Sequence, residues 1–303
     1  MKNILIIGGS SALGKYLIDA HLLDGDRVIS TSRNIRNKKY DASEQFNEIK
    51  YDLLDESDLI ELLNLSHSLD GFDKVYCVAS AVPANCNDTD IFFKTNVVGY
   101  DILLNNIELK FGALIVYMSS MSCYQPVDGC LDHSSPLVVD QSYPASKNLM
   151  SFVLQEIVKR RRNNIRAISF IIPTLLTVGN PNNFFINWTN TIFDKSSINI
   201  FNPDAPFNAC IDAKNILEIA RAIYCQSSFV QPKIFLAGQV TTLRNIFLTL
   251  VNERLLSEKQ LQVINNDRPS TTLPITDIKK LKISVPQISD MLINEIKTFR
   301  SSK

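Results

Sequence analysis

The chain has 303 residues, 45% of them hydrophobic, which is enough apolar material for one large α/β domain or for such a domain with a smaller appendage. Its 31 basic and 31 acidic residues cancel, so no overall charge attracts nucleic acid or an anionic membrane, and neither is expected as a partner. No apolar run reaches the roughly 18 to 20 residues that a membrane-spanning helix requires.

Cysteine and histidine usage limits the kinds of site that the chain can hold. The six cysteines include no Cys-x-x-Cys pair and follow no signal peptide, which favours reduced thiols in the cytoplasm. The histidines, His21, His67 and His133, form no metal-ligand spacing, so no metal is expected. The basic run 159–162 falls where a predicted helix ends, and there cations complement the helix dipole; a polyanion-binding patch is the alternative.

Short apolar strands alternate with helical segments in the N-terminal half. Strands are predicted at 3–7, 27–31, 48–51, 74–79, 113–118 and 166–172, and helices at 14–23, 56–64, 90–108 and 143–162. This alternation predicts an α/β fold with a Rossmann-type, doubly wound parallel sheet over residues 1–173. The pattern weakens after Pro173, so residues 174–303 are predicted to form mostly a smaller substrate-binding lobe, from which some segments return to the sheet.

A glycine-containing loop follows the first predicted strand and opens the first helix. It consists of Gly8, Gly9, Ser10, Ser11, Ala12, Leu13 and Gly14. A dinucleotide pyrophosphate binds to such loops because free backbone N–H groups and the helix dipole meet there. Gly14-Lys15 also suits a triphosphate-binding loop, but Tyr16 stands where that loop needs a Ser or Thr for Mg²⁺. A simple tight turn is the third interpretation.

The end of the second predicted strand indicates which dinucleotide binds. Arg33 lies there, and no acid precedes Asp41. Further cations follow: Arg36, Lys38 and Lys39. A carboxylate at this point would bind the adenosine ribose hydroxyls, whereas a cation accommodates a 2′-phosphate. NADP is therefore favoured, NAD remains possible, and a solvated basic loop is the alternative. Asp52, after the next strand, either accepts a hydrogen bond from the adenine amino group or starts a helix.

Tyr143 and Lys147 are the residues most suggestive of catalysis. They lie four apart on a predicted helix, so the Lys147 ammonium can approach the Tyr143 phenol and lower its pKa. Such a tyrosine can exchange a proton with a carbonyl or carbinol oxygen near neutral pH. The pair alone is common on solvated helices, but here it follows the glycine loop and Ser120. Ser120 either hydrogen-bonds the reacting oxygen or is a strand-end hydroxyl bonded to the backbone.

In this order, the motifs resemble those of the extended short-chain dehydrogenases/reductases, in their sugar-nucleotide epimerase, dehydratase and reductase group, along nearly the whole chain. The matching segments are the glycine loop, Val78-Ala79-Ser80-Ala81, Asn96-Val97-Val98-Gly99, Ser119-Ser120 shortly before Tyr124, Tyr143-x-x-x-Lys147 and Asp267-Arg268-Pro269.

The resemblance implies roles for particular residues. The catalytic set is Ser120, Tyr143 and Lys147. Beside the cofactor, in addition to the glycine loop, Arg33 and Asp52, it places Leu53, Ala79, Ser80, Ala81, Asn96, Tyr143, Lys147 and Pro173. On the substrate it places Ser120, Ser122, Thr174, Asn208 and Arg268.

Departures from the family pattern limit which reactions the resemblance implies. Ser11 and Ala12 stand where relatives have a further glycine, so the helix can approach the cofactor less closely. Asn208 stands where an arginine often binds the substrate diphosphate, which leaves that role to Arg268. Dehydratases of the group carry two acids directly after the catalytic hydroxyl residue, whereas this chain has Met121-Ser122, so dehydration is disfavoured.

The resemblance therefore implies an NADP-dependent reductase of a nucleotide-linked 4-keto deoxyhexose, made for surface polysaccharide. A nucleotide-sugar 4-epimerase with tightly bound NAD is the alternative within the family. A non-catalytic dinucleotide-sensing or scaffold protein is the alternative from another class, although such proteins tend to lose the Tyr/Lys pair that this chain keeps.

Two predicted helices carry more apolar side chains than one sheet-facing stripe requires. These are Phe92, Phe93, Val97, Ile102, Leu103 and Leu104 in one, and Leu149, Met150, Phe152, Val153 and Leu154 in the other. A self-complementary patch favours a closed two-fold homodimer. Burial of both helices by the substrate lobe is the alternative.

Overall fold

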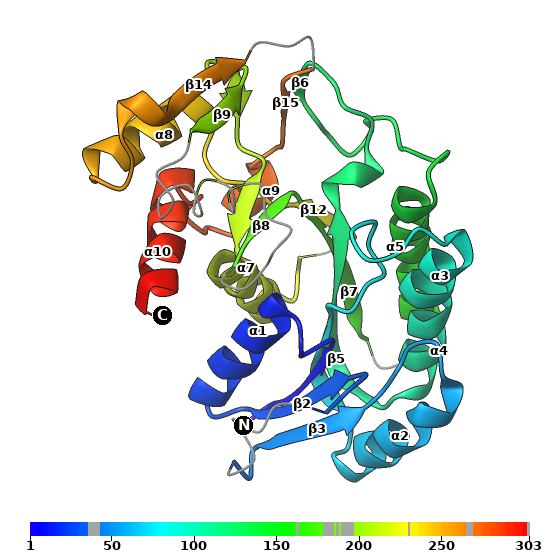
Figure 1. Ribbon diagram of the computed structural model, residues 1–303. Coiled ribbons are helices and arrows are strands. Elements are labelled where there is room, and N and C mark those ends of the chain that lie inside the picture. The colour runs from blue at the N-terminus through cyan, green and yellow to red at the C-terminus, as the bar shows by residue number, and fades with distance from the viewer. Residues whose placement is uncertain are drawn as a thin grey trace. The chain divides into compact units, whose positions relative to one another are not determined.

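The computed structural model describes residues 1–35, 43–161, 164–177, 185, 188, 197–229, 231–264 and 269–301 (Figure 1). The first half contains β1 (Asn3–Ile7), α1 (Ala12–Leu23), β2 (Arg27–Ser32), β3 (Phe46–Lys50), α2 (Leu59–Ser68), β4 (Phe72–Cys77), α3 (Thr89–Phe93), α4 (Gly99–Asn106), β5 (Leu109–Ser120), β6 (Gly129–Cys130) and α5 (Ser142–Arg160). Within the described residues, no helix is both long enough and apolar enough to cross a membrane.

The remaining elements are shorter. They are β7 (Arg166–Ile172), β8 (Thr174–Leu176), β9 (Ile198–Phe201), β10 (Pro206–Phe207), β11 (Cys210–Asp212), α7 (Ala213–Cys225), β12 (Lys233–Phe235), β13 (Thr241–Thr242), α8 (Leu243–Asn252), β14 (Leu261–Ile264), β15 (Thr271–Thr272), α9 (Thr276–Lys280) and α10 (Ile288–Ser301).

Seven strands form one sheet in the order β12-β7-β5-β4-β1-β2-β3. The pairs β1 with β2, β2 with β3, β1 with β4 and β4 with β5 are parallel. From β1 the chain adds strands outward to β3, and then crosses back to β4 and continues in the opposite direction. In doubly wound sheets, ligands bind at the carboxyl ends of the strands on either side of such a reversal. The predicted α/β Rossmann-type sheet is confirmed.

Helices cover both faces of this sheet. All five residues of β1 are buried, and alternate side chains point to opposite faces. Leu5 and Ile7 belong to one hydrophobic cluster with Leu62 of α2, Leu103 of α4 and Leu154 of α5. Figure 1 shows α2, α4 and α5 on that side of the sheet and α1 on the other. Burial of the apolar faces of these helices against the sheet therefore stabilises the fold.

The predicted helix 90–108 is divided rather than continuous. Between α3 and α4, residues Lys94–Val98 form a π-helical turn in which the Gly99 N–H donates to the Lys94 carbonyl, five residues back. A π turn fits one extra residue into a helix, and such turns occur often at functional sites. The division therefore directs attention to Asn96, at the centre of the turn.

Contacts divide the chain into two units, and their bounds differ from the predicted 1–173 and 174–303. The first unit is 1–123, 137–171 and 220–234, and the second is 124–136, 172–219 and 235–303. Residues 220–234 belong to the first unit because Arg166 donates to the carbonyls of Ile223, Tyr224 and Gln226. Residues 124–136 belong to the second unit because β6 pairs with β15, 142 residues further along the chain by the Gly129↔Thr271 register.

Small strand pairs organise the second unit. The pairs β8 with β11, β9 with β14 and β6 with β15 are parallel, whereas β10 and β13 are antiparallel. Within the same unit His133 lies 3.0 Å from the buried carboxylate of Asp277, and Lys280 lies 3.2 Å from it. The β6–β15 pair and the His133–Asp277 contact join segments that are far apart in the sequence. Local periodicity after Pro173 therefore could not predict them.

The basic run near the end of α5 contacts helix carbonyls. Arg161 donates to the carbonyls of Leu104 and Ile107, at the end of α4. Arg160 donates to the Glu156 carbonyl of its own helix. The prediction that these cations complement a helix C-terminus is confirmed, although the helix that Arg161 completes is α4 rather than α5.

Candidate active site

At three positions of the loop after β1, neighbouring atoms lie so close that they leave no room for a side chain. A Cβ on Gly8 would lie 2.6 Å from the Ala79 nitrogen, and Gly8 also has a φ of +96°. A Cβ on Gly14 would lie 2.4 Å from the Gly8 carbonyl oxygen, and one on Gly9 would lie 1.8 Å from Oγ of Ser30. The loop is therefore folded tightly against β2 and β4, with its backbone at the N-terminus of α1.

Ser11 has a structural role where relatives carry a glycine. Its hydroxyl accepts from the Gly14 N–H at 3.0 Å and donates to the Gly8 carbonyl at 2.8 Å, so it caps α1 and closes the loop. The positive end of the α1 dipole then lies at this loop, where an anion can bind. These features fit a dinucleotide pyrophosphate, which Gly8 to Gly14, including Ser10, Ala12 and Leu13, would hold.

Asn96 connects the next two segments of the site. Its side-chain oxygen accepts from the Ser80 hydroxyl at 2.8 Å and from the Ala81 N–H at 2.9 Å. Its side-chain nitrogen donates to the Ala81 carbonyl at 3.0 Å and to the Ser146 hydroxyl at 3.1 Å. Asn96 is fully buried, so this one side chain fixes the turn after β4 against α5. Ala79 is held in turn by Tyr100, whose hydroxyl donates to its carbonyl at 2.7 Å.

Ser120, Tyr143 and Lys147 converge where β5 ends and α5 begins. Ser120 lies close enough to Tyr143 to act on the pKa of its phenol, which it lowers. The Lys147 ammonium lies 5.9 Å from the centre of the Tyr143 ring and 4.7 Å from that of Tyr117, and it donates to the Met118 carbonyl at 2.8 Å. Lys147 is only 2% exposed, and no carboxylate of the described residues acts on the pKa of its ammonium. The predicted catalytic residues are thus neighbours in the first unit.

The pKa values of this pair differ from the expectation. Burial raises the pKa of Tyr143 to about 12, and the hydrogen bond from Ser120 only partly offsets this. Burial likewise lowers the pKa of Lys147 to about 8. Burial therefore opposes the expected lowering of the phenol pKa, and Lys147 is not among the groups that shift it in this structure. Tyr143 keeps its proton at neutral pH, which is the form that donates.

The residues assigned to the adenosine end lie at the ends of β2 and β3. Arg33 is exposed directly after β2. Asp52 accepts from the Leu54 N–H at 3.0 Å, so part of its carboxylate already closes a local turn. Leu53 is buried, and a Cβ on Gly99 would lie 2.3 Å from its carbonyl oxygen, which explains the glycine of the Asn-Val-Val-Gly segment. The other cations of the predicted basic cluster, at 36, 38 and 39, lie outside the described residues.

The predicted substrate residues fall into two groups. Ser122 lies beside Ser120 in the first unit. Pro173, assigned to the cofactor, and Thr174 follow β7 in the second unit, and Arg268 lies outside the described residues. Asn208 requires a correction, because its buried amide donates to the Leu273 carbonyl at 2.7 Å and accepts from the Leu273 N–H at 2.8 Å. Both amide groups are thus occupied by backbone, and Asn208 joins two segments of the second unit.

Sequence reasoning missed two residues that position the site. Ser146 bonds to Asn96, Tyr117 lies against the Lys147 ammonium, and the Tyr117 hydroxyl donates to the Asn96 carbonyl at 3.2 Å. Tyr117 is fully buried with its hydroxyl bonded. A polar aromatic residue inside an otherwise apolar strand was the one available signal, since a buried tyrosine hydroxyl usually has a partner.

The fold resembles those of several solved sugar-nucleotide enzymes. UDP-glucuronic acid 4-epimerase from Bacillus cereus in complex with NAD is 17% identical, with a TM-score of 0.76 over 99% of this chain and 98% of that one. UDP-N-acetylglucosamine 4-epimerase from Methanobrevibacter ruminantium is 18% identical, with a TM-score of 0.76 over 100% and 99%. dTDP-glucose 4,6-dehydratase from Bacillus anthracis is 12% identical, with a TM-score of 0.73 over 99% and 97%. At these identities the likeness establishes the fold.

Comparison of the sequence gives the family. Sterol-4-alpha-carboxylate 3-dehydrogenase, decarboxylating, from Dictyostelium discoideum is 29% identical over 105 residues, which are 35% of this chain and 30% of that protein. The pattern of the NAD dependent epimerase/dehydratase family matches residues 4–227. Because that match takes in most of the chain, the protein belongs to the NAD dependent epimerase/dehydratase family.

Proposed function

We propose that the protein is an NADP-dependent reductase of a nucleotide-linked 4-keto deoxyhexose, acting in the cytoplasm. The observation that carries the proposal is the convergence of Ser120, Tyr143 and Lys147 on the fold of this family. Solved enzymes with this fold include complexes with UDP-glucose and with UDP-N-acetylmuramic acid, which supports a nucleotide-linked substrate. All six cysteines are free thiols, in keeping with a reducing compartment.

Charge at the end of β2 supports NADP. Arg33 is exposed there, and the strand itself, Arg27–Ser32, contains no carboxylate that would repel a 2′-phosphate. A guanidinium offers planar, permanently charged donors to phosphate. NADP exchanges with the solution pool in a reductase, whereas several solved relatives are complexes with NAD.

The bound dinucleotide would supply a hydride to the carbonyl carbon of the substrate. Tyr143, protonated at neutral pH because burial raises its pKa to about 12, would donate its proton to the oxygen of the same carbonyl. Ser120 would hydrogen-bond that oxygen as negative charge develops on it. The Lys147 ammonium, fixed by the Met118 carbonyl, would then stabilise the phenolate that Tyr143 leaves behind.

The residues after Ser120 argue against dehydration. Elimination of water needs an acid and a base beside the ring, and Met121 and Ser122 supply neither. A 4-epimerase that retains NAD is the second candidate, and two of the structural relatives are 4-epimerases. An epimerase needs the same three catalytic residues, so the reactions differ in their use of cofactor rather than in Ser120, Tyr143 and Lys147.

One experiment separates these candidates. The purified protein is mixed with NADPH or NADH and a panel of 4-keto and 4-hydroxy nucleotide sugars, while absorbance at the nicotinamide band and the sugar NMR spectrum are followed. A reductase consumes NADPH in proportion to product. Interconversion of 4-hydroxy epimers without net change in the nicotinamide would instead establish the epimerase. Binding of dinucleotide with neither reaction would favour a sensor or scaffold.

We also infer a two-fold homodimer through α4 and α5. Six of the apolar residues that suggested it are buried within the protomer: Phe92, Val97, Leu103, Leu104, Met150 and Leu154. Leu149 and Phe152 remain 43% and 58% exposed on one face of α5, and Val98 is 49% exposed. Static light scattering at micromolar concentration should give twice 34.1 kDa; a mass near 34.1 kDa would contradict the dimer.

A further inference from the structure

The Lys147 ammonium is buried beside groups that carry no negative charge. Lys147 is 2% exposed, and burial lowers the pKa of its ammonium to about 8. The groups that oppose this lowering are the thiols of Cys123 and Cys77. Burial raises the pKa of both thiols, so they are protonated and uncharged at neutral pH. Within the described residues, no anion therefore balances the charge of Lys147.

Two tyrosine rings lie close to this ammonium. Its Nζ is 4.7 Å from the ring centre of Tyr117 and 5.9 Å from that of Tyr143. Burial raises the pKa of both phenols, so neither is an anion at neutral pH. The face of an aromatic ring nevertheless attracts a cation that lies within about 6 Å of its centre. Tyr117, the nearer ring, thus contacts the ammonium together with the Met118 carbonyl, which accepts from Nζ at 2.8 Å.

The Tyr117 ring is fixed in this position. Its backbone lies in β5 opposite Cys77 of β4, and its hydroxyl donates to the Asn96 carbonyl in the π turn at 3.2 Å. The ring of Tyr100 packs against it nearly at a right angle, with ring centres 5.7 Å apart. Tyr117 and Tyr100 are both fully buried. The attraction between a cation and a ring is strongest in such a desolvated place.

We propose that Tyr117 is a positioning residue that keeps the Lys147 ammonium charged and in place through the face of its ring. The ring attracts the amine only in its protonated form, so the contact raises the pKa of Lys147 and opposes the effect of burial. The consequence for turnover rests on the proposed function, in which a charged Lys147 stabilises the phenolate that Tyr143 leaves behind. Tyr117 acts through Lys147 and takes no part in proton transfer itself.

The first test measures the pKa of Lys147 without substrate. Protein labelled with carbon-13 at Cε of lysine is titrated by NMR, and Lys147→Met identifies the signal. Phenylalanines with zero, one, two and three ring fluorines are placed at position 117 by nonsense suppression. Fluorine withdraws electron density from the ring face and changes the ring size little. The pKa of Lys147 should fall stepwise along this series, by about one unit in total, since the contact weakens at each step.

Tyr100 provides the matched control for this series. It is a fully buried tyrosine whose hydroxyl donates to the Ala79 carbonyl at 2.7 Å. Where the structure describes the chain, the Lys147 ammonium lies over the rings of Tyr117 and Tyr143 and not over that of Tyr100. The same fluorinated series at position 100 should therefore leave the pKa of Lys147 nearly unchanged. A pKa that does not respond to fluorination at position 117 would overturn the proposal, and so would an equal response at position 100.

The second test follows the pH dependence of turnover. Lys147 is charged below its pKa, so a reaction that needs this charge slows as pH rises through that pKa. Tyr117→Leu removes the ring, lowers the pKa and should move the falling limb of the kcat profile to lower pH by about one unit. Tyr117→Phe keeps the ring and should leave the limb in place. A purely structural role for Tyr117 would lower kcat at every pH without moving the limb. If Tyr117→Leu does not fold, the fluorinated series, which keeps the ring, decides.

The two tests separate this proposal from the proposed function. A Lys147 pKa that follows fluorination at position 117, together with no reductase activity on any substrate, would retain the role of Tyr117 and refute the reductase. A Lys147 pKa that ignores fluorination, together with full reductase activity, would refute the role of Tyr117 and retain the reductase.

Discussion

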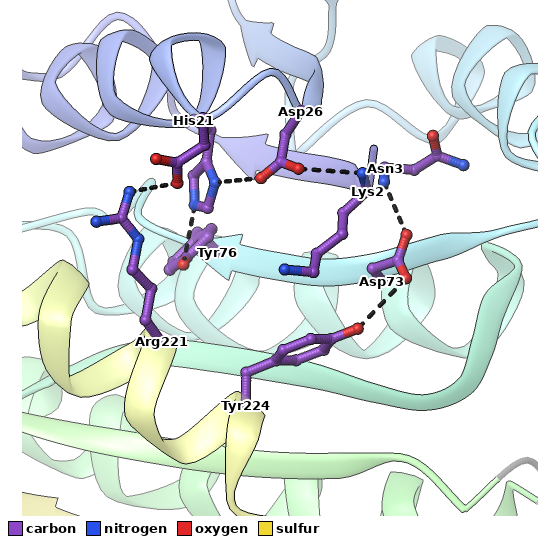
Figure 2. A network of polar contacts seen from close by, with 9 residues as sticks. Lys2, Asn3, His21, Asp26, Asp73, Tyr76, Arg221 and Tyr224 are labelled. Carbon is purple, nitrogen blue, oxygen red and sulfur yellow. Dashed lines mark hydrogen bonds and ion pairs between the residues drawn. The ribbon is translucent and has the colours of Figure 1, made fainter.

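The two ends of the parallel strands in the first unit carry polar side chains of different kinds. At the carboxyl ends lie glycines, hydroxyls and the Lys147 ammonium, and the buried Oγ of Ser30, beneath Gly9, has no hydrogen-bond partner among the described residues. At the amino ends lies a denser group of charged and aromatic residues, shown in Figure 2, in which each carboxylate has a donor. Both ends are therefore polar, and they differ in how far their polar groups are already hydrogen-bonded within the protein.

The network at the amino ends is closed on itself. The His21 ring lies between Asp26, at 3.0 Å from Nδ1, and the Tyr76 hydroxyl, at 3.1 Å from Nε2. Because a carboxylate only accepts, Nδ1 carries the proton and Nε2 accepts from Tyr76. Asp26 also accepts from the Lys2 N–H at 3.0 Å, and Arg221 of α7 pairs with Asp24. Figure 2 shows these side chains converging between α1, β4 and α7.

This network shows that residue types alone do not identify a metal site. His21, Asp24 and Asp26 offer ligand atoms that all lie within 4.8 Å of one another, as a metal site would. Each of the three, however, is already bonded to a protein partner. Burial lowers the pKa of His21 to about 4, so the ring is neutral and its contact with Asp26 is a hydrogen bond to a carboxylate rather than an ion pair. A metal ion would have to displace those bonds.

The same substitution at each end should separate catalysis from stability. Tyr143→Phe should lower kcat about a thousandfold and leave dinucleotide affinity nearly intact, because only the transferable proton is lost. Tyr76→Phe should leave kcat unchanged but lower the free energy of unfolding by about 1–3 kcal/mol, because His21 Nε2 loses its donor. Steady-state kinetics and urea unfolding of both variants check this. A Tyr143→Phe enzyme with more than a tenth of the wild-type kcat would refute the catalytic assignment.

The second prediction concerns acid sensitivity. The folded pKa of His21 is about 4 and the unfolded value is 6.5, so protonation favours unfolding. This contribution to stability is complete above pH 6.5 and is lost as pH falls toward 4, amounting to about 3 kcal/mol. In His21→Gln, unfolding free energy should fall less over this range. Parallel curves for wild type and His21→Gln would contradict the prediction.

The third prediction compares two arginines of one strand. Arg33, just past the carboxyl end of β2, should contact the 2′-phosphate, so Arg33→Ala should weaken NADPH binding by about 1.5–3 kcal/mol and NADH binding much less. Arg27 begins the same strand at its amino end, and Arg27→Ala should change neither affinity. Calorimetric titration of both variants measures this. Equal losses of NADPH and NADH in Arg33→Ala would refute the NADP preference.

The smallest predicted effect is the most direct test of the difference between the two ends of the strands. Ser30 and Ser66 are both fully buried, but Ser30 Oγ has no hydrogen-bond partner in the part of the chain that the structure describes. Ser66 donates to the Leu63 carbonyl at 2.8 Å and accepts from the Glu108 N–H at 3.1 Å. Ser30→Ala should change the unfolding free energy by less than about 0.5 kcal/mol or increase it, while Ser66→Ala should cost about 1–2 kcal/mol. Denaturant titrations of both variants measure these changes in unfolding free energy. Equal destabilisation by the two substitutions would mean that the comparison of the two ends is mistaken.

Features that depend on neighbours in the sequence could be predicted. The strand, loop and helix around Gly8 to Gly14 follow from local periodicity and backbone requirements, and the strands of β1 and β7 have the predicted bounds. The proposed catalytic residues were also named from the sequence: Tyr143 and Lys147 by their helical spacing, and Ser120 by the family resemblance. The helical spacing is a local signal, so no knowledge of long-range packing was needed to notice it.

Features that depend on distant neighbours could not be predicted. Asn208 was assigned to the substrate, but its partner Leu273 is 65 residues away. The sign of the Tyr143 pKa shift depends on burial by surrounding segments, which a sequence does not display. The sequence Lys-Thr-Asn-Val-Val at 94–98 consists mostly of weak helix formers and does not distinguish a π turn from a turn of α-helix. The network of His21 requires β4 to lie beside β1.

The π turn also bears on how this site tolerates insertions and deletions. Removing one residue from Lys94–Val98 would let α3 and α4 join as a regular helix, which is the more common geometry. The segment before the deletion would then rotate by about 100° relative to the segment after it, since an α-helix has 3.6 residues per turn. Asn96 would lose Ser80, Ala81 and Ser146 together. A length change that improves the helix would thus disconnect the turn after β4 from α5, and lineages that keep the chemistry should keep the extra residue.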